Sequence, residues 1–341
     1  MGKYRENRFW RPVQPMSEEE QCLPRAVAVV GPTAAGKTDL ALRLAHDLKL
    51  PILCCDSVQV YRGLDIGSAK PGQVERTRVP HFLLDLIDPD QEFSAGDYAR
   101  AAKMQLATGP GIFCGGTGFY LRSALWSVSG DGASGSALDL SRDEPLRRAF
   151  ERTWEAREAA KEGAVHDALR VADAETAGTI HPNNVVRVLR ALWHCDRIGG
   201  PLSDFRRKNP PRKCLKLMII VVDPGVNEVD VSIGARCDAM FAAGWVEEVE
   251  KLLAAGYDAS YKAMRSLGYR QLVDHLRAPK RLSLAEVALD IKNATRHYAR
   301  RQRTFFRHQF SDLPERQIVH ISDPNDCPVD PIAVFLRGDP S

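Results

Sequence analysis

The segment from residue 31 to residue 38 has the residue types and spacing of a phosphate-binding loop. It reads Gly31-Pro-Thr-Ala-Ala-Gly36-Lys37-Thr38 and fits the pattern G-x-x-x-x-G-K-[ST] at every fixed position. The glycines let the backbone curl so that N–H groups point at an anion, in front of a helix N-terminus. Lys37 adds a positive charge, and the Thr38 hydroxyl suits Mg²⁺. A glycine-rich turn is the alternative, but the strand-like residues before the loop and the helical pattern after it favour phosphate binding.

Two acidic residues follow apolar runs and are candidates for chemistry. Asp56 comes directly after residues 52–55, a short apolar run, and ligands of doubly wound sheets bind at the carboxyl ends of the strands. An acid at that place can act on a substrate or bind Mg²⁺. The ordinary alternative is that Asp56 caps a turn or a helix. Asp85 ends a second apolar run, residues 82–85, and has the form of a Walker B acid.

The elements that must position these residues alternate along the chain. Short apolar strands are expected before the loop and at residues 52–55, 112–114, 217–222 and 318–321, with helices between them. Strands separated by helices at this spacing indicate a parallel sheet built of βαβ units. We therefore predict an α/β fold, a P-loop NTPase-like parallel sheet flanked by helices. Expected helices cover residues 94–106, where Ser94 and Asp97 imitate a capping box, and also 119–126, 229–255 and 284–308.

A helical segment interrupts this alternation. Residues 127–141 break the composition, the pattern from 143 to about 199 is helical throughout, and Pro210-Pro211 ends it. Within it we expect helices at 145–163, 165–177 and 184–197. We predict a flexible N-terminal extension (1–24), a P-loop α/β core (25–130 and 210–325) and an inserted all-helical subdomain (131–209).

The composition limits the classes of protein that the chain can represent. The 341 residues are 44% hydrophobic and 27% charged, which is ordinary for a soluble protein. The net charge of +3 is too small to indicate a partner, and the eight cysteines contain no C-x-x-C pair. This pattern favours a reducing cytoplasm over a disulfide framework or a zinc site. No apolar run has the length of a membrane span, and the N-terminus lacks the apolar region of a secretory signal.

A cluster of basic residues lies near the end of the expected helix 284–308. Six lysines and arginines and no acid occur between 292 and 307, and positions 296, 300, 303 and 307 share one helix face. On the opposite face, Ile291, Ala294, Tyr298 and Phe305 should pack. A solvated charged face usually mixes both signs. We therefore interpret the stripe as a track for a polyanion, which would position a nucleic acid without reading its bases.

The motifs, taken together, resemble those of a known family. GPTAAGKT, DSVQVYRGLDIGSAKP, PHFLLDLIDP, GGTGFYL, HPNNVVRVLRAL and MRSLGYRQL occur in this order, and from about residue 25 to 307 the chain is similar to the tRNA dimethylallyltransferases. The resemblance implies transfer of a dimethylallyl group from its diphosphate to the exocyclic N6 amine of the adenosine immediately 3′ of the anticodon, in the anticodon stem-loop of tRNA. The P-loop would then hold the prenyl diphosphate and Mg²⁺ rather than ATP.

The resemblance also implies roles for individual residues. Asp56 matches the general base, Thr117 the hydroxyl beside that base and the metal, and Lys37 a catalytic cation; Thr38 and Asp56 would bind the metal. The implied diphosphate-binding residues are Gly31, Pro32, Thr33, Ala34, Ala35, Gly36, Lys37, Thr38 and Arg265. The implied tRNA-binding residues are Asp56, Ser57, Val58, Gln59, Thr117, Arg147, Val186, Arg187, Val188, Leu189, Arg190, Arg265, Ser266, Leu267, Gly268, Tyr269 and Arg270, to which the basic stripe adds Arg296, Arg300 and Arg303.

The chain departs from the family's pattern at several positions. Ala35 stands where Ser is frequent, Asn184 replaces a common Asp and Trp193 a common Glu. Ser232 stands where many members have Arg, whereas Arg236 is kept, so Arg265 would have to supply the missing cationic contact to the diphosphate. No paired cysteines or histidines follow residue 307, so the zinc finger of eukaryotic members is absent.

Three other functions remain open from the residues alone. An adenylate isopentenyltransferase would do the same chemistry on a free nucleotide, but the helical insertion and the basic stripe argue against it. A P-loop small-molecule kinase would use Asp85 as its Walker B acid, but the sequence shows no acceptor-binding signature. A non-catalytic RNA-binding P-loop protein leaves Asp56 and Thr117 unexplained. We expect a cytoplasmic monomer that uses Mg²⁺, dimethylallyl diphosphate and tRNA and has no contact with membranes.

Overall fold

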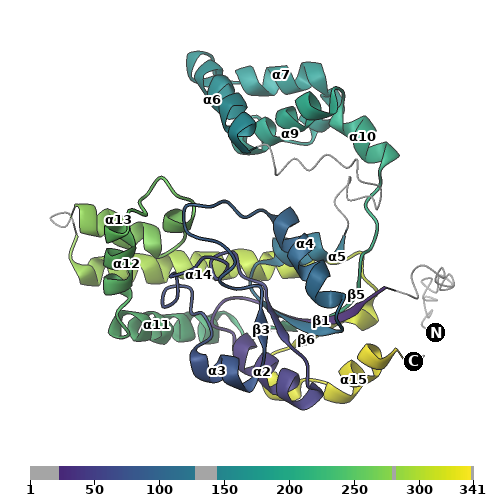
Figure 1. Ribbon diagram of the computed structural model, residues 1–341, viewed down its shortest axis with the longest axis vertical. Coiled ribbons are helices and arrows are strands. Elements are labelled where there is room, and N and C mark those ends of the chain that lie inside the picture. Colours follow the sequence, from purple (N-terminus) through teal and green to yellow (C-terminus); the bar gives the residue numbers. More distant parts are fainter. Residues whose placement is uncertain (1–22, 127–143, 279–281, 339–341) are drawn as a thin grey trace, which may run out of the picture.

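The computed structural model describes residues 23–126, 144–278 and 282–338, so residues 1–22 of the predicted extension and the composition break at 127–141 lie outside the described residues. The core is a six-stranded parallel sheet with strand order β3-β2-β4-β1-β5-β6 (Figure 1). Its strands are β1 (Arg25–Val30), β2 (Ile52–Cys54), β3 (His81–Phe82), β4 (Gly111–Gly115), β5 (Lys216–Val222) and β6 (Ile318–Ile321). The predicted α/β fold class is therefore confirmed.

Helices cover both faces of the sheet, as the sequence of β1 requires. Successive side chains of a strand point to opposite faces. Ala26 and Ala28 accordingly join the hydrophobic cluster beneath α4 (Ala95–Leu106) and α5 (Gly118–Leu125), whereas Val27 and Val29 join the cluster beneath α2 (Lys37–Leu48). The remaining helices of the core are α3 (Gln73–Arg78), α11 (Val226–Ala242), α12 (Trp245–Ala254), α13 (Tyr269–Arg277), α14 (Leu284–His308) and α15 (Val329–Arg337).

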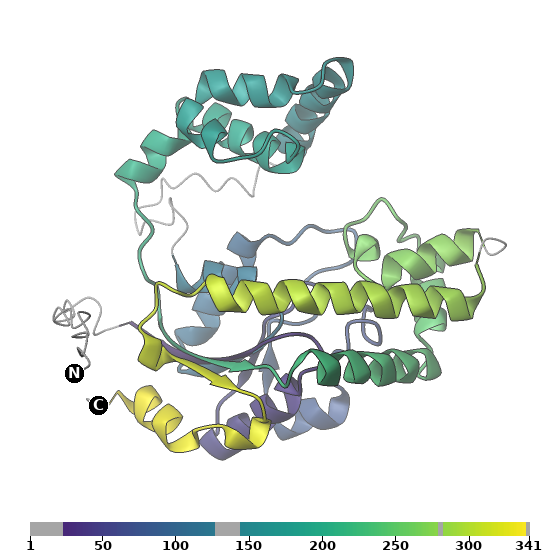
Figure 2. The same cartoon turned by 180° about the vertical axis from the view of Figure 1, so that it is seen from behind.

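The helical insertion encloses a hydrophobic cluster of its own. It consists of α6 (Glu144–Ala160), α7 (Ala164–Ala172), α8 (Ala174–Gly178), α9 (Val185–Ile198) and α10 (Leu202–Lys208), and Figures 1 and 2 show it standing apart from the sheet. The expected helix 165–177 is in fact two helices, because Asp173 ends α7 and caps α8 by accepting a hydrogen bond from the Thr176 amide at 2.9 Å. Asp173 also accepts from the Ser203 amide at 2.7 Å and thereby fixes α10.

Three further features differ from what the sequence indicated. The helix expected at 229–255 is broken at Gly244, whose φ of 95° ends α11 and starts α12. The run 82–85 yields only the two-residue strand β3. Helix α15 was not expected; it follows Pro328 and packs next to β1, where the Phe335 carbonyl accepts a hydrogen bond from Arg25 at 2.7 Å. Within the described residues, no helix is long and apolar enough to cross a bilayer.

Candidate active site

The P-loop connects β1 to α2 in the predicted way. A Cβ at Gly31 would lie 2.1 Å from the Val222 carbonyl oxygen of β5, so only glycine allows the loop to leave the sheet here. Lys37, the first residue of α2, is buried and donates from Nζ to the Pro32 carbonyl at 2.5 Å. Burial, with a smaller contribution from the nearby Arg236, lowers the pKa of Lys37 to about 8 against the opposing effects of Cys114 and Asp56. Two cations, Lys37 and Arg236, therefore lie near the carboxylate of Asp56 beside the loop.

Residue Thr33 of the loop is already engaged by two other elements. Its amide donates to Gln302 Oε1 of α14 at 2.8 Å, and its hydroxyl accepts from the Arg236 guanidinium at 3.2 Å. Gln302 in turn donates to the Gly116 carbonyl at 2.9 Å, so it joins the P-loop to the end of β4. The Thr33 amide therefore points at Gln302 in this structure, and the Thr33 hydroxyl orients Arg236. That arginine was not among the predicted site residues.

Asp56 and Thr117 meet at the carboxyl ends of β2 and β4. Thr117 Oγ1 accepts from the Ser57 amide at 3.0 Å, and the Thr117 amide donates to the Cys55 carbonyl at 3.1 Å. Asp56 Oδ1 accepts from the amides of Val58 (2.8 Å) and Gln59 (3.3 Å), which is the turn-capping role. Among the described residues, no hydrogen bond engages Oδ2. Both interpretations of Asp56 are therefore compatible, since one oxygen fixes the turn and the other can accept a proton.

A pocket of about 260 Å³ lies beside these residues. Its polar wall contains Thr33, Asp56, Ser57 and Arg236. Tyr298 of α14 also lines it, and burial together with the neighbouring Asp56 raises the pKa of Tyr298 to about 12, so the phenol stays protonated. The sequence predicted Tyr298 only as a packed residue; the i, i+4, i+7 spacing of Ile291, Thr295 and Tyr298, all of which line the pocket, was the available signal. The other lining residues are Ala34, Val58, Gly67, Ser68, Ile233, Cys237, Met240, Trp245, Ser266 and Leu267.

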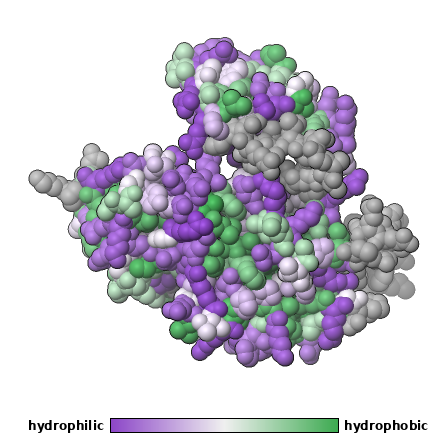
Figure 3. Space-filling model, in the orientation of Figure 1, coloured by the Kyte–Doolittle hydropathy of each residue, from purple (hydrophilic) through white to green (hydrophobic). Residues whose placement is uncertain are grey.

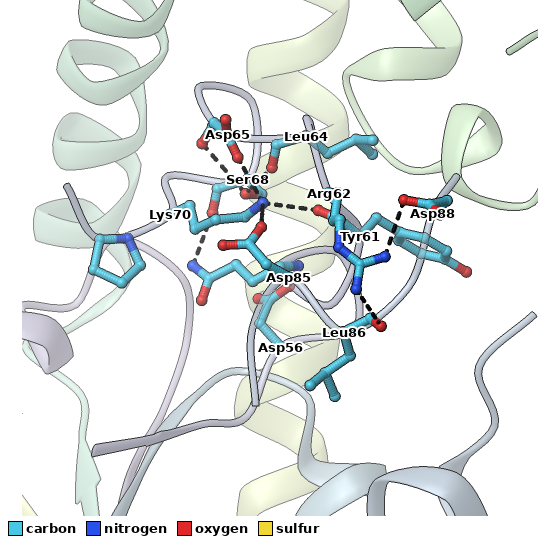
Figure 4. Close-up of polar contacts among 12 residues, drawn as sticks. Asp56, Tyr61, Arg62, Leu64, Asp65, Ser68, Lys70, Asp85, Leu86 and Asp88 are labelled. Carbon is cyan, nitrogen blue, oxygen red and sulfur yellow. Dashed lines mark hydrogen bonds and ion pairs between the residues drawn. The ribbon is translucent and has the colours of Figure 1, made fainter. Parts of the chain in front are cut away.

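Lys70 fastens the loop that follows Asp56 (Figure 4). Its side chain is 1% exposed, and Nζ lies 2.6 Å from Asp65 Oδ1, 2.6 Å from Asp85 Oδ1 and 2.7 Å from the Tyr61 carbonyl oxygen. Asp85 also accepts from Arg76 at 2.9 Å. Burial opposes ionisation of Asp85, but the two cations hold its pKa below the ordinary value. The interpretation of Asp85 as a Walker B acid is wrong, because its carboxylate is used to fix this loop.

The predicted tRNA contacts fall into two groups. Arg147 on α6, Arg190 on α9 and Arg265 lie close enough to Lys262 to add to the lowering of its pKa, which is caused mainly by burial. Arg147 also pairs with Glu92 of the core at 2.6 Å. The space-filling view shows hydrophobic residues on the core just below the notch that separates it from the insertion (Figure 3). Four other predicted contacts, Val188, Leu189, Gly268 and Tyr269, are buried and support the fold, and that they touch tRNA stays a prediction.

The basic stripe on α14 is not free of acids in space. Arg303 is 14% exposed and binds both carboxylate oxygens of Asp223, at 2.5 and 2.6 Å. Arg300 lies 3.4 Å from Asp230 but stays 52% exposed, and Lys292 lies 2.6 Å from Asp238. The prediction that this face presents four guanidinium groups is wrong for Arg303, because α11 and the turn before it supply acids opposite the helix. Figure 2 shows α11 running alongside α14. Arg296 donates to the side chain of Asn293 at 2.9 Å.

Comparisons with known proteins agree with this arrangement. A family model described as IPP transferase matches residues 59–309, and one described as isopentenyl transferase matches residues 24–85. A tRNA dimethylallyltransferase from Solibacter usitatus is 39% identical to this chain over 91% of it and 98% of the relative. One from Geobacter metallireducens is 42% identical over 86% of this chain and 92% of the relative. The crystal structure of the full-length tRNA isopentenylpyrophosphate transferase from Bacillus halodurans has a TM-score of 0.60 and 30% identity, covering 92% of this chain and 96% of that one.

Proposed function

This chain belongs to the IPP transferase family, and we propose that it transfers a dimethylallyl group from dimethylallyl diphosphate to tRNA. The acceptor is the exocyclic N6 amine of the adenosine immediately 3′ of the anticodon, and diphosphate is released. The observation that carries the proposal is the two-sided pocket, in which Asp56, Thr33 and Arg236 face an otherwise mostly apolar lining. Such a lining suits a short hydrocarbon attached to an anion better than it suits a nucleoside triphosphate.

The cations beside the pocket suit the departing diphosphate. In the transition state the allylic C–O bond breaks and negative charge develops on the diphosphate, so preorganised donors in a dry site stabilise it. Arg236 is partly buried, and its hydrogen bond to the Thr33 hydroxyl at 3.2 Å holds the guanidinium at the P-loop, which supports this role. Lys37 lies beside it within the P-loop. Arg265, the predicted substitute for the cation missing at Ser232, does not line the pocket, and Arg236 is the better candidate.

Asp56 is suited to take the proton of the amine. As the adenine N6 forms its bond to C1 of the dimethylallyl group, the nitrogen must lose a proton, and a carboxylate positioned to accept it contributes about 10²–10⁴-fold. The two amide hydrogen bonds to Oδ1 hold the carboxylate in place, and Oδ2 is left for the acceptor. Thr117, which is tied to Ser57, fixes the same turn.

Asp56 and Thr38 could supply some, but not all, of the ligands of a magnesium ion. Mg²⁺ binds hard oxygen ligands, with one or two carboxylates plus substrate phosphates and several waters, and when bound it would neutralise charge on the diphosphate. Asp56 supplies a carboxylate, and the hydroxyl of Thr38 is exposed at the start of α2. Within the described residues, no group of three or more His, Cys, Asp or Glu could hold a metal by itself. This favours a metal that arrives with the diphosphate.

The position of the basic residues supports tRNA as the acceptor. Arg147 and Arg190 of the insertion and Arg265 of the core gather around Lys262, so a polyanion there would contact both parts of the protein. The target base has to leave its stack to reach the pocket, which costs less in a single-stranded loop than in a duplex. All the cysteines in the described part of the chain are free, in keeping with a cytoplasmic enzyme, and we expect it to act as a monomer.

The direct test is a transfer assay with purified protein, dimethylallyl diphosphate, Mg²⁺ and unmodified tRNA, followed by nucleoside analysis for prenylated adenosine. Asp56→Asn should retain the melting temperature and tRNA affinity but lower turnover at least about 100-fold, because the proton acceptor is lost while the shape remains. AMP offered as the acceptor should remain unmodified. Near-normal turnover in Asp56→Asn would remove this residue from the role of base.

A further inference from the structure

The apolar lining of the pocket continues along α11 away from the P-loop. Arg236 lies at the P-loop, and Met240 lies one helical turn further along the same helix, about 6 Å on. The pocket volume of about 260 Å³ is below the roughly 300–1,000 Å³ of pockets that hold drug-sized ligands. The space next to the P-loop is therefore short, and one residue of its lining limits it. That residue is Trp245, which begins α12 just after the break at Gly244.

The indole of Trp245 cannot move out of the way. It is 2% exposed, and two glycines border it so closely that a Cβ at Gly67 or Gly268 would lie 2.0 or 2.2 Å from its ring atoms. Tyr269 packs against it edge-on, with ring centroids 5.8 Å apart, and Phe241 packs on it at 5.6 Å. The segments that contain Gly67 and Gly268 therefore pack directly on the indole and leave it no room to change its rotamer.

Glu248, one turn after Trp245, locks these two segments together. Its carboxylate accepts hydrogen bonds from the amides of Asp65 (3.0 Å) and Ile66 (2.7 Å), next to Gly67. The same carboxylate accepts from the Tyr269 hydroxyl at 2.6 Å, next to Gly268. The walls on both sides of the indole are thus held by one partly buried carboxylate, so the end of the pocket is rigid.

We propose that Trp245 determines donor specificity by limiting the prenyl chain to five carbons. This inference rests on the proposed function. A ten-carbon geranyl chain attached to a diphosphate at the P-loop would have to extend into the space that the indole occupies, and a rigid wall rejects it by steric overlap. Replacement of the indole by a smaller side chain should open the pocket in that direction.

The experiment compares geranyl diphosphate with dimethylallyl diphosphate as donors to the same tRNA. The measured quantity is the ratio of kcat/KM for the ten-carbon donor to kcat/KM for the five-carbon donor. Trp245→Leu should raise this ratio by about tenfold or more, since a single methylene in an apolar pocket already changes discrimination by about 10–200-fold. Trp193→Leu is the matched control: Trp193 is also buried, 4% exposed, and lies in the insertion. Its ratio should equal that of the parent protein.

The outcomes separate this inference from the proposed function. An unchanged ratio in a Trp245→Leu protein that melts like the parent would overturn the inference while transfer of the five-carbon group still stands. A parent protein that uses both donors equally would overturn it as well. If Trp245→Leu does not fold, Met240→Ala enlarges the same pocket and should raise the ratio in its place; an unchanged ratio there also overturns the inference. If the parent transfers neither group to tRNA, the proposed function fails.

Discussion

Replacement of Arg303 by Gln tests whether the basic stripe binds tRNA or stabilises the core. Arg303 binds both oxygens of Asp223, at 2.5 and 2.6 Å, and the two side chains are 14% and 26% exposed. Glutamine retains the helix propensity needed within α14 and the aliphatic part of the side chain near the backbone. The variant therefore removes the ion pair and little else. Asp223 is left without its main partner just before α11.

The expected loss of stability follows from the burial of this pair. An exposed ion pair contributes about 0–1 kcal/mol, whereas removal of one partner of a fully buried pair costs about 3–5 kcal/mol. The Arg303–Asp223 pair is mostly buried, so we expect a loss of about 2–3 kcal/mol. At roughly 2–4 °C per kcal/mol, the melting temperature should fall by about 4–12 °C.

The loss should depend on pH in a defined direction. Burial opposes ionisation of Asp223, but the hydrogen bonds from Arg303 and from the Gly225 amide hold its pKa below the ordinary value. A carboxylate with a lowered folded-state pKa stabilises the fold above the unfolded-state pKa, about 3.9 for aspartate, and this stabilisation is lost as the pH falls through the folded-state pKa. The parent and Arg303→Gln should therefore differ most at neutral pH and converge as the pH falls below the ordinary aspartate pKa and through the lowered folded-state pKa of Asp223.

Calorimetry and salt-dependent tRNA binding together decide between the two roles. Asp223→Asn and the double variant complete a mutant cycle that isolates the pair. Arg300→Gln is the control, because Arg300 is 52% exposed and its ion pair with Asp230 is longer, at 3.4 Å. It should change stability by less than about 1 kcal/mol but reduce the salt slope of tRNA binding by up to about 0.7–0.9 if it contacts a phosphate. A parental melting temperature together with a reduced salt slope in Arg303→Gln would refute this reasoning.

Two further predictions concern the lysines of the site. Affinity for dimethylallyl diphosphate, measured by titration calorimetry, should weaken as the pH rises through about 8, because the pKa of Lys37 is lowered to about 8 and the neutral amine no longer attracts phosphate. Lys37→Met should bind the diphosphate weakly, with little change over that range. If the affinity of Lys37→Met falls with pH as that of the parent does, Lys37 is not the group that titrates. Lys70→Met should lower the free energy of unfolding by about 2–3 kcal/mol, somewhat less than for a fully buried pair because Asp65 is 58% exposed; an unchanged denaturation midpoint would contradict this.

The sequence predicted elements whose signals are local. The predicted bounds of α14 and β6 agree with the structure. The capping box at the start of α4 forms as expected, since Ser94 Oγ accepts from the Asp97 amide at 3.1 Å and the Ser94 amide donates to Asp97 at 2.8 Å. These features depend on residues within a few positions of one another, so periodicity and residue type were sufficient to find them.

The contacts that the sequence did not reveal join residues far apart in the chain. The stripe on α14 looked free of acids because Asp223 precedes Arg303 by 80 positions. Asp85 resembled a metal ligand because its partner Lys70 lies in a different loop, 15 positions earlier. The period of a helix tells which residues share a face but not what another element places opposite that face. Helix α15 was missed because the fold was expected to end at β6.

The organisation of α14 explains why its basic stripe is a poor guide to its role. Along one helix, Ile291 and Tyr298 line the pocket beside Asp56, and Gln302 connects the P-loop to the end of β4. A Cβ at Gly116 would lie 2.0 Å from Gln302 Nε2, so the glycine-rich turn after β4 is shaped by this helix. Arg303 follows Gln302 directly, and its pairing with Asp223 holds the helix at the register that these contacts need. Arg303, one of the residues that suggested an RNA track, therefore anchors the helix that lines the pocket beside Asp56. We expect contact with tRNA at the exposed positions of the helix, Arg300 above all.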